Sequence, residues 1–286
     1  MKHFHDEDIQ KLEVIANDIR QSIVAMLEKA KSGHTAGPLG MADIFTAFYF
    51  HILKHDPANP DWEERDRLIL SNGHIVPVRY ATMAHAGYFP KEELMTLRTF
   101  GSRLQGHPER ERLPGMETTS GPLGSGLGQA AGIALAARMD GKTFRTYCLM
   151  SDGEQDAGAV WESALFAGKY KLANLTGVID RNMIQIDGST EVVMPLESLR
   201  AKWEAFGWHV LECDGHNFAE FVGAVGQAHA IADRPTVIIA HTIPGKGVPE
   251  IEYDFKWHGT PPNAEQAKRF LHELRTLRGK IVSEHE

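Results

Sequence analysis

The sequence predicts an α/β protein in which helices cover both faces of a doubly wound, mostly parallel sheet. Two observations lead to this fold class. Short apolar segments that suit buried strands alternate with stretches of helical periodicity, a pattern typical of strand–helix–strand units. Polar loops follow most of these apolar segments, where the carboxyl ends of parallel strands would place them. The chain has 286 residues, 42% of them hydrophobic and 24% charged, which is ordinary for a folded globular protein.

The predicted elements run in a regular order along the chain. A helix opens it, because apolar residues recur at helical spacing from Ile9 to Leu27. Buried strands are expected at 68–70, 146–150, 175–179, 209–212 and 237–240. Helices are expected between them at 130–138, 160–170, 196–206 and 218–232, and a charged amphipathic helix is expected last, at 264–286. No repeat or flexible linker divides the chain, so residues 1–286 are expected to form a single domain.

Composition and charge argue against several classes of protein. The 38 acidic side chains outnumber the 30 of Lys and Arg, which argues against a sequence-independent grip on nucleic acid. No run approaches the ~18 apolar residues of a membrane span. No apolar leader follows Met1, so we expect a cytoplasmic protein with no membrane partner. The two cysteines, Cys148 and Cys213, lie in apolar segments, as buried free thiols do.

Polar loops follow four of the predicted strands. They begin at Ser71, Ser151, Asp180 and His241, and they carry acidic, amide, histidine and glycine residues. Parallel strands end at the same edge of a sheet, and ligands of doubly wound sheets bind beyond that edge. The four loops are therefore expected to form one site.

Asp152 and Asn182 are the candidates for a metal site. They lie 30 residues apart, which is the spacing of two consecutive strand ends with a helix between them. A carboxylate, an amide oxygen and a nearby backbone carbonyl are hard ligands that suit Mg²⁺ or Ca²⁺ and leave positions for phosphate oxygens and water. Gly153 would let the backbone approach an anion closely. Taken singly, the two side chains would instead cap a helix and stabilise a turn.

A longer pattern surrounds these residues. The stretch from Ser151-Asp152-Gly153-Glu154 to Asp180-Arg181-Asn182-Met183-Ile184-Gln185-Ile186-Asp187-Gly188 resembles the cofactor-binding half of transketolase, a thiamine diphosphate enzyme. Further segments resemble the same family in the same order, at 32–37, 71–74, 106–109, 119–124 and 258–259. On this resemblance the sequence is identified as the N-terminal, thiamine diphosphate-binding section of a transketolase.

The resemblance implies a role for each matched residue. Mg²⁺, or Ca²⁺ in its place, would be held by Asp152, Asn182 and the backbone carbonyl of Ile184. The cofactor would be bound by residues from several motifs: His74, Gly121, Pro122, Leu123, Asp152, Gly153, Glu154, Asn182, Ile184 and His258. The residues that face the substrate and act in catalysis would be His34, His107 and His258.

Histidines fit the reaction of this family. Ketol transfer breaks a carbon–carbon bond beside a carbonyl, and the thiazolium ring of the cofactor takes up the electron pair. The protein must then supply hydrogen-bond donors for the developing alkoxide and proton carriers that work near neutral pH. The three predicted catalytic histidines could serve both purposes.

The resemblance also implies a partner. The family's pyrimidine-binding and C-terminal domains have no counterpart in the matched segments, and the glutamate that activates the cofactor lies in the first of them. We therefore expect a split transketolase in which a C-terminal-section chain supplies that glutamate, with two copies of each chain. Sugar phosphates of the pentose phosphate pathway are the expected substrates.

Some positions depart from the family pattern. Ser151 stands where the family has glycine, and Ala157 stands where many members have a glutamate that contacts the activating one. Glu162, which is retained, could carry that contact alone. Arg79 is an unexpected charge on an apolar helix, and Lys246 suits a solvated side chain as well as an anion ligand.

Other functions stay open on the sequence. The alpha subunit of a 2-oxoacid dehydrogenase also binds this cofactor with a partner, although the histidine set favours transketolase. A transketolase for an unusual or sulfonated ketose and a non-catalytic binding module are further alternatives. The glycine-rich segment 121–128 does not fit a dinucleotide-binding motif, because no strand precedes it.

Overall fold

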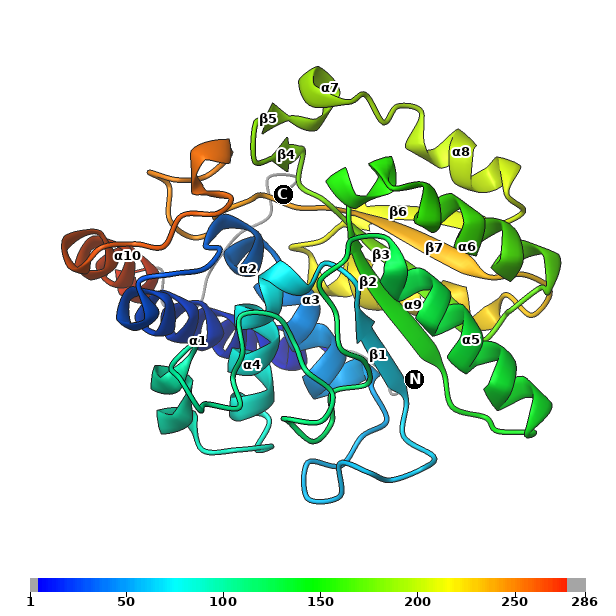
Figure 1. Ribbon diagram of the computed structural model, residues 1–286, viewed down its shortest axis with the longest axis horizontal. Helices are drawn as coiled ribbons and strands as arrows, with labels where there is room; N and C mark the ends of the chain where they lie inside the picture. Colours follow the sequence, from blue (N-terminus) through cyan, green and yellow to red (C-terminus); the bar gives the residue numbers. More distant parts are fainter. Residues whose placement is uncertain (1–4, 277–286) are drawn as a thin grey trace.

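A computed structural model describes residues 5–276 (Figure 1). Its centre is a five-stranded parallel sheet with the strand order β1-β2-β3-β7-β6. The strands are β1 (Arg67–Leu70), β2 (Thr146–Ser151), β3 (Leu175–Arg181), β6 (His209–Asp214) and β7 (Thr236–His241). Each contains the apolar segment predicted as a strand, so the predicted α/β class with a parallel sheet is confirmed.

Helices cover both faces of the sheet, as Figure 1 shows. One face packs against α1 (Asp6–Ala30), α3 (Ala42–Ala47), α4 (Val76–His85), α9 (Phe218–Ala230) and α10 (Ala264–Thr276). The other packs against α5 (Ser125–Met139), α6 (Gly158–Lys169) and α8 (Leu199–Ala205). Successive residues of a strand point to opposite faces, and accordingly Leu68 and Leu70 join the first core and Ile69 the second. The sheet is therefore doubly wound, with two apolar cores.

Short elements fill the loops. They are α2 (Ala36–Gly40), the π-helical η1 (Phe48–Ile52) and the 3-10 turns η2 (Gly73–Ile75), η3 (Lys91–Thr96), η4 (Gly153–Asp156) and η5 (Phe255–Trp257). The segment after β3 forms a small hairpin, β4 (Ile184–Gln185) and β5 (Gly188–Ser189), followed by α7 (Thr190–Val193). Only the turn residues Asp187-Gly188 signalled this hairpin, because strands of two residues show no alternating pattern.

Some predicted boundaries differ from the observed ones. The helix predicted at 196–206 is α8 and begins later, at Leu199. The final helix is described as α10 up to Thr276. The rest of its predicted extent, 277–286, and the first four residues lie outside the described part of the chain. None of the helices within residues 5–276 is long and apolar enough to cross a membrane.

At one point of the sheet, the connections that follow two neighbouring strands pass to opposite faces. After β3 the chain passes to α8 on one face, and after the adjacent β7 it passes to α10 on the other. Loops that diverge in this way open a crevice at the carboxyl ends of the strands, which is the usual ligand position in such folds. The hairpin and α7 lie at this end of the sheet (Figure 1).

Candidate functional site

A cavity of about 200 Å³ lies at the carboxyl ends of β1, β2 and β3. Seven of the predicted site residues line it: His74, Leu123, Gly153, Glu154, Asn182, Ile184 and His258. Asp152 lies under it, fully buried, and Asp180, which was not among the predicted ligands, is part of its wall. Gly121, Pro122, His34 and His107 lie outside the lining. The loops after β1, β2 and β3 therefore converge as predicted, whereas the fourth loop reaches the cavity through His258 and not through residues 241–247.

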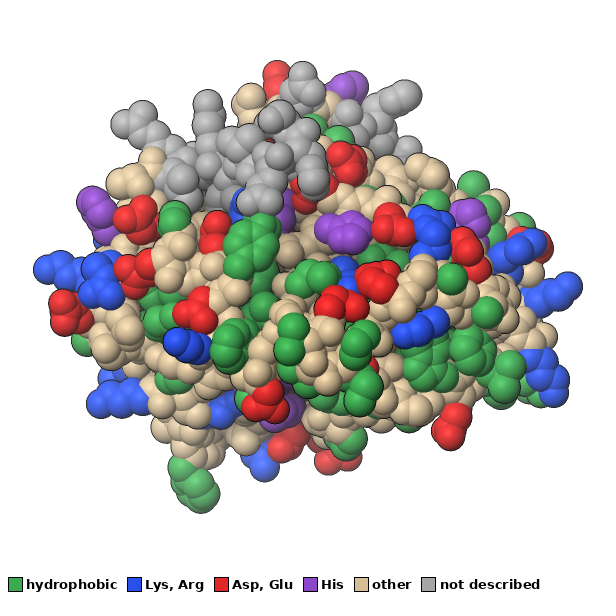
Figure 2. All heavy atoms as spheres, turned by 90° about the horizontal axis from the view of Figure 1, so that it is seen from above, with side chains coloured by type: hydrophobic (Ala, Val, Ile, Leu, Met, Phe, Trp, Pro, Cys, Tyr) green, Lys and Arg blue, Asp and Glu red, His purple; other side chains and the backbone are tan. Residues whose placement is uncertain are grey.

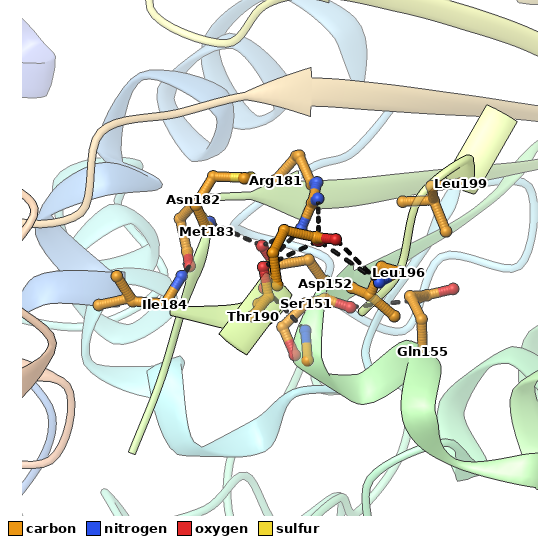
Figure 3. Close-up of polar contacts among 12 residues, drawn as sticks. Ser151, Asp152, Gln155, Arg181, Asn182, Met183, Ile184, Thr190, Leu196 and Leu199 are labelled. Carbon is orange, nitrogen blue, oxygen red and sulfur yellow. Dashed lines mark hydrogen bonds and ion pairs between the residues drawn. The ribbon is translucent and has the colours of Figure 1, made fainter. Parts of the chain in front are cut away.

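Asp152 is held by hydrogen bonds on both carboxylate oxygens (Figure 3). Its Oδ1 accepts the N–H of Gly153 at 2.7 Å, and its Oδ2 accepts the N–H of Met183 at 2.7 Å. The guanidinium of Arg181 also reaches Oδ2, at 3.3 Å. Asp152 therefore caps the turn after β2 and at the same time fastens the loop after β3.

The loop after β3 turns sharply at Asn182. The side-chain Oδ1 of Asn182 accepts the N–H of Ile184 at 3.0 Å, and its Nδ2 donates to Asp180 at 2.8 Å. Met183 between them has φ 66°, a left-handed conformation that non-glycine residues seldom adopt. The local capping and turn roles that the sequence left open are thus both present. Backbone strain of this kind is concentrated at functional sites.

The chemistry of this loop pair fits a divalent cation. Asp152 after β2 and Asn182 and Ile184 after β3 offer a carboxylate, an amide and a carbonyl oxygen at two neighbouring strand ends, all hard ligands. Burial raises the pKa of Asp152 to about 6. Burial and the neighbouring Asp152 raise the pKa of Asp180 to about 7. The pKa of Asp152 is raised in spite of the Arg181 guanidinium beside it, and a bound cation would stabilise both carboxylates further. Within residues 5–276 no cluster of three acidic, His or Cys side chains has a metal-binding arrangement.

Gly153 lines the cavity, and a side chain could be added there only if a neighbour moved. A side-chain carbon there would lie 3.0 Å from Cγ of Gln185, which packs over the turn. Gly153 is also the first residue of η4, and the first N–H groups of this turn donate within the loop: Gly153 to Oδ1 of Asp152, Glu154 to the hydroxyl of Ser151 and Gln155 to the carbonyl of Asp152. Gly153 therefore contributes a cavity wall without a side chain rather than free donors.

Glu154 joins three of the loops at the base of the cavity. Its Oε1 accepts the hydroxyl of Ser71 and the N–H of Gly124 at 2.5 Å. Its Oε2 accepts the N–H of Ser151 at 3.2 Å. The carboxylate is buried, and burial raises its pKa. Predicted as a cofactor-binding residue, Glu154 has the contacts of a residue that aligns the loops around the cofactor.

Asn72 is a site residue that the sequence prediction did not single out. It is fully buried, lines the cavity, and neither its Oδ1 nor its Nδ2 has a hydrogen-bond partner among the described residues. Buried amides are almost always paired, so this side chain is poised for a ligand. Its place in the polar loop after β1 was the signal that could have identified it. The same signal applied to Asp180 and Arg181.

Three histidines from separate loops pack against one another beside the cavity. The ring centroids of His34 and His74 lie 4.7 Å apart, and that of His258 lies 5.4 Å from His34 and 5.3 Å from His74. Burial lowers the pKa of all three, that of His34 to about 4, and the neighbouring histidines lower those of His34 and His74 further. The rings are therefore neutral near pH 7. The buried Nδ1 of His34 has no hydrogen-bond partner within the described part of the chain.

His107 and the glycine turn lie at the side of this histidine cluster. A side-chain carbon on Gly73 would lie 3.1 Å from Cδ2 of His107, and one on Gly121 would lie 3.9 Å from the same atom. His107 thus packs between the loop after β1 and the Gly121-Pro122-Leu123 turn. Burial lowers its pKa, and the positive charge of Arg98 lowers it further.

The structure also places the residues whose roles the sequence left undecided. Arg79 is buried and donates to the hydroxyl of Tyr49 at 3.2 Å and to the carbonyl of Gly115 at 3.1 Å, so it holds loops together away from the cavity. Lys246 is buried but does not line the cavity. Ala157 precedes α6, and Glu162 is exposed on that helix.

Comparison with known proteins gives matches over almost the whole chain. The family profile of the thiamine diphosphate binding domain of transketolase matches residues 11–276. One of the subunits of an apulose-4-phosphate transketolase, from Phocaeicola vulgatus, is 40% identical over 97% of this chain and 98% of its own length. A 6-deoxy-6-sulfo-D-fructose transketolase subunit of a Clostridium species is 43% identical over 91% of this chain and 94% of its own. Transketolase of Mus musculus is 36% identical over 96% of this chain, which spans 44% of its length.

Solved structures give the same result. Transketolase from Leishmania mexicana matches 92% of this chain with a TM-score of 0.87 and 34% identity, over 41% of its own chain. Transketolase from Campylobacter jejuni matches 96% with a TM-score of 0.87 and 35% identity, over 44% of its own chain. The fold and enzyme class predicted from the sequence are thereby confirmed. The chain belongs to the transketolase family and carries its thiamine diphosphate-binding domain.

Proposed function

We propose that this chain is the N-terminal-section subunit of a split transketolase that depends on thiamine diphosphate and Mg²⁺. It would transfer a two-carbon ketol unit between sugar phosphates. The observation that carries the proposal is the cavity at the strand ends, where a buried acid–amide turn lies on one side and neutral histidines lie on the other. The match to the transketolase family favours this function over that of a 2-oxoacid dehydrogenase subunit.

The chain's own residues would hold the cofactor at its diphosphate end. Asp152, Asn182 and the carbonyl of Ile184 would bind Mg²⁺, and the diphosphate would lie beside them against Gly153, which lines the cavity. Leu123 of the glycine turn lines the cavity and would contact the cofactor's apolar surface. When bound, thiamine diphosphate supplies an electron sink for the bond that breaks.

The histidines would donate hydrogen bonds to the substrate oxygens and accept protons from its hydroxyl groups. Because His34, His107 and His258 all have lowered pKa values, each would present one N–H donor and one basic nitrogen at neutral pH. The N–H can stabilise an alkoxide, and the basic nitrogen can accept a hydroxyl proton. His74, which lines the cavity and packs against His34, would contact the diphosphate.

A second chain would complete the site. The chain carries hydrophobic side chains on the surface of α5, α6 and the segment around α7, among them Met139, Leu165, Ile186 and Val192, which are between 60% and 83% exposed. Figure 2, which looks onto the side that carries α7, shows hydrophobic side chains gathered over the middle and right of this face. Apolar areas of this kind mark protein interfaces. The two relatives named as transketolase subunits support the same arrangement. A partner chain with the activating glutamate, two copies of each chain and a cytoplasmic location complete the proposal.

The sugar is the open part of this function. Two relatives are named for apulose 4-phosphate and for 6-deoxy-6-sulfo-D-fructose, and both are more similar to this chain than the transketolase of Mus musculus. A ketose outside the pentose phosphate pathway, with a phosphate or sulfonate group, is therefore the second candidate for the donor.

The test is purification of the tagged chain from its native host in thiamine diphosphate and Mg²⁺. The eluate would be assayed for ketol transfer to ribose 5-phosphate from xylulose 5-phosphate, apulose 4-phosphate and 6-deoxy-6-sulfofructose. We expect a co-purified chain and cofactor-dependent transfer from one of these donors, and none when the Asp152→Ala chain is the bait. Transfer at full rate by this chain alone would refute the split arrangement. A co-purified chain with no transfer from any donor would refute the activity.

A further inference from the structure

Arg98 lies between the loops that carry two of the proposed catalytic histidines. It follows η3 with φ 59°, and its backbone N–H donates to the carbonyl of Leu104 at 2.9 Å, which closes a tight turn. For a residue other than glycine, this left-handed conformation carries backbone strain. The result is a guanidinium placed beneath the site, outside the set of residues that line the cavity.

The guanidinium contacts both loops directly. Its Nη1 donates to the hydroxyl of Ser32 at 2.8 Å, and its Nη2 donates to the carbonyl of Gly106 at 3.4 Å. Ser32 lies two residues before His34, and Gly106 immediately precedes His107. The two bonds therefore connect one histidine loop to the other.

Gly106 makes room for this side chain, and Gly33 lies against it in ordinary contact. A side-chain carbon on Gly106 would lie 2.9 Å from Cζ of Arg98, closer than such contacts occur. One on Gly33 would lie 3.9 Å from its Nε, and Gly33 has φ 129°. Each of the two histidines thus directly follows a glycine whose backbone packs against the same guanidinium.

We propose that Arg98 is the positioning residue that fixes His34 and His107 relative to each other and keeps positive charge next to both rings. The proposal deepens the proposed function, on which the catalytic part of it rests. A planar fork with several donors suits this task, because one side chain can bond two loops in a fixed geometry. Lysine would keep the charge and lose the fork.

The electrostatics agree with the geometry. Besides burial, the charges that lower the pKa of His34 come from His258, Arg98 and His107, and His74 packs against its ring. The charge that lowers the pKa of His107 comes from Arg98. Arg98 is thus the permanently charged group that both histidines share.

One donor of Arg98 lacks a hydrogen bond, which costs free energy. Its Nε–H is buried and has no hydrogen-bond partner among the described residues. An unpaired buried donor costs about 1–3 kcal/mol, which argues that the position is kept for the charge and the two loop contacts.

The experiment compares Arg98→Met, Arg98→Lys and Gly106→Ala with Arg103→Met as the control. Arg103 lies in the same segment and pairs with Glu93 at 2.5 Å on the surface, so its loss tests a charge change away from the histidines. The first readout is the NMR titration of the His34 and His107 rings in the full chain, which needs no activity. The second is the pH profile of kcat/KM in the complex with the partner chain.

We expect Arg98→Met to raise the pKa of both histidines by about 0.5–1 unit and to shift the acidic limb of the kcat/KM profile in the same direction. Arg98→Lys should leave both pKa values near the wild-type ones. It should still lower kcat about tenfold, because the loops are no longer held together. Gly106→Ala, which displaces the guanidinium but keeps its charge, should lower kcat in the same way.

Histidine pKa values and a pH profile that match those of Arg103→Met in every Arg98 variant would overturn the proposal. If Arg98→Met does not fold, the Lys and Ala variants decide, since unchanged kcat in both would remove the positioning role. A wild-type complex without ketol transfer would refute the proposed function, and the ring titration would still decide whether Arg98 acts on both histidines.

Discussion

His34 shows how a single residue acquires a chemical role from its surroundings. Its ring packs against His74 and His258, its Nδ1 is buried without a partner among the described residues, and burial lowers its pKa to about 4. A histidine in a helix on the surface has none of these properties. The sequence identified His34 through its motif, whereas the unpaired nitrogen is visible only in the fold.

Replacing His34 by Ala should lower turnover by about 10²–10⁴-fold, since it removes a donor and a proton acceptor at the substrate. The affinity for thiamine diphosphate should change little, because the proposed metal ligands Asp152, Asn182 and Ile184 are untouched. Steady-state kinetics and cofactor titration of the complex measure the two effects. His272→Ala, on the exposed side of α10, is the control. A loss of cofactor affinity as large as the loss of turnover would place His34 at the cofactor instead.

Residues of the site could be predicted where spacing or a recognised motif marked them. Asp152 and Asn182 were identified from their spacing at strand ends and the histidines from their motifs, and Asn182, His74 and His258 line the cavity. Asn72 and Arg98 were not identified, for a physical reason. The place of Asn72 after β1 was a signal, but its burial without a partner and the bridge that Arg98 makes between two loops depend on contacts between segments far apart in sequence, which no local pattern encodes.

At the scale of elements, Glu154 connects β2, the loop after β1 and the start of α5. It accepts hydrogen bonds from Ser71, Gly124 and Ser151, and no cation contacts it among the described residues. A buried carboxylate of this kind is stable only while every donor is in place. The three elements are therefore held in one arrangement around the cavity.

Replacing Glu154 by Gln should lower the free energy of unfolding by about 1–3 kcal/mol, because the new NH₂ group faces N–H donors and leaves one of them unpaired. Urea unfolding of the chain measures this. Glu162→Gln, on the exposed surface of α6, should change it by less than about 0.5 kcal/mol. Equal stability of the two variants would contradict the role of Glu154 in holding the loops.

The elements themselves were predictable to different degrees. Strands that are buried on both faces, such as β3 with all of its residues buried, appear in the sequence as continuous apolar runs. The β4–β5 hairpin escaped prediction because each of its strands has two residues and its stability comes from contacts with the loop after β3. The carboxyl edge of the sheet could thus be located, but the shape of the segment over it could not.

At the scale of the whole molecule, the stability of the fold should depend on pH through a half-buried histidine away from the site. His229 on α9 bonds the hydroxyl of Tyr147 on β2 at 2.7 Å, and burial together with Arg145 lowers its pKa from 6.5 to about 4. The folded protein therefore binds fewer protons at this group than the unfolded chain between these two values. It loses stability as the pH falls through that window.

The variant His229→Gln isolates this contribution. The difference in unfolding free energy between wild type and variant should be constant above pH 6.5 and should shrink as the pH falls toward 4. Urea unfolding of both proteins at about pH 7.5 and about pH 5 measures it. A difference that does not change between these pH values would show that His229 does not titrate in the way its burial predicts.

The central claim is that the strand-end loops form the metal and diphosphate half of a thiamine diphosphate site. The most direct test is the affinity of the complex with its partner chain for thiamine diphosphate, measured by calorimetry with Mg²⁺ and with a chelator. We expect Mg²⁺ to strengthen binding strongly in the wild type. Asp152→Ala should abolish this dependence while the chain stays folded, because a ligand of the metal and the tie to Met183 are lost. Equal, metal-dependent affinity in the wild type and the variant would contradict the account.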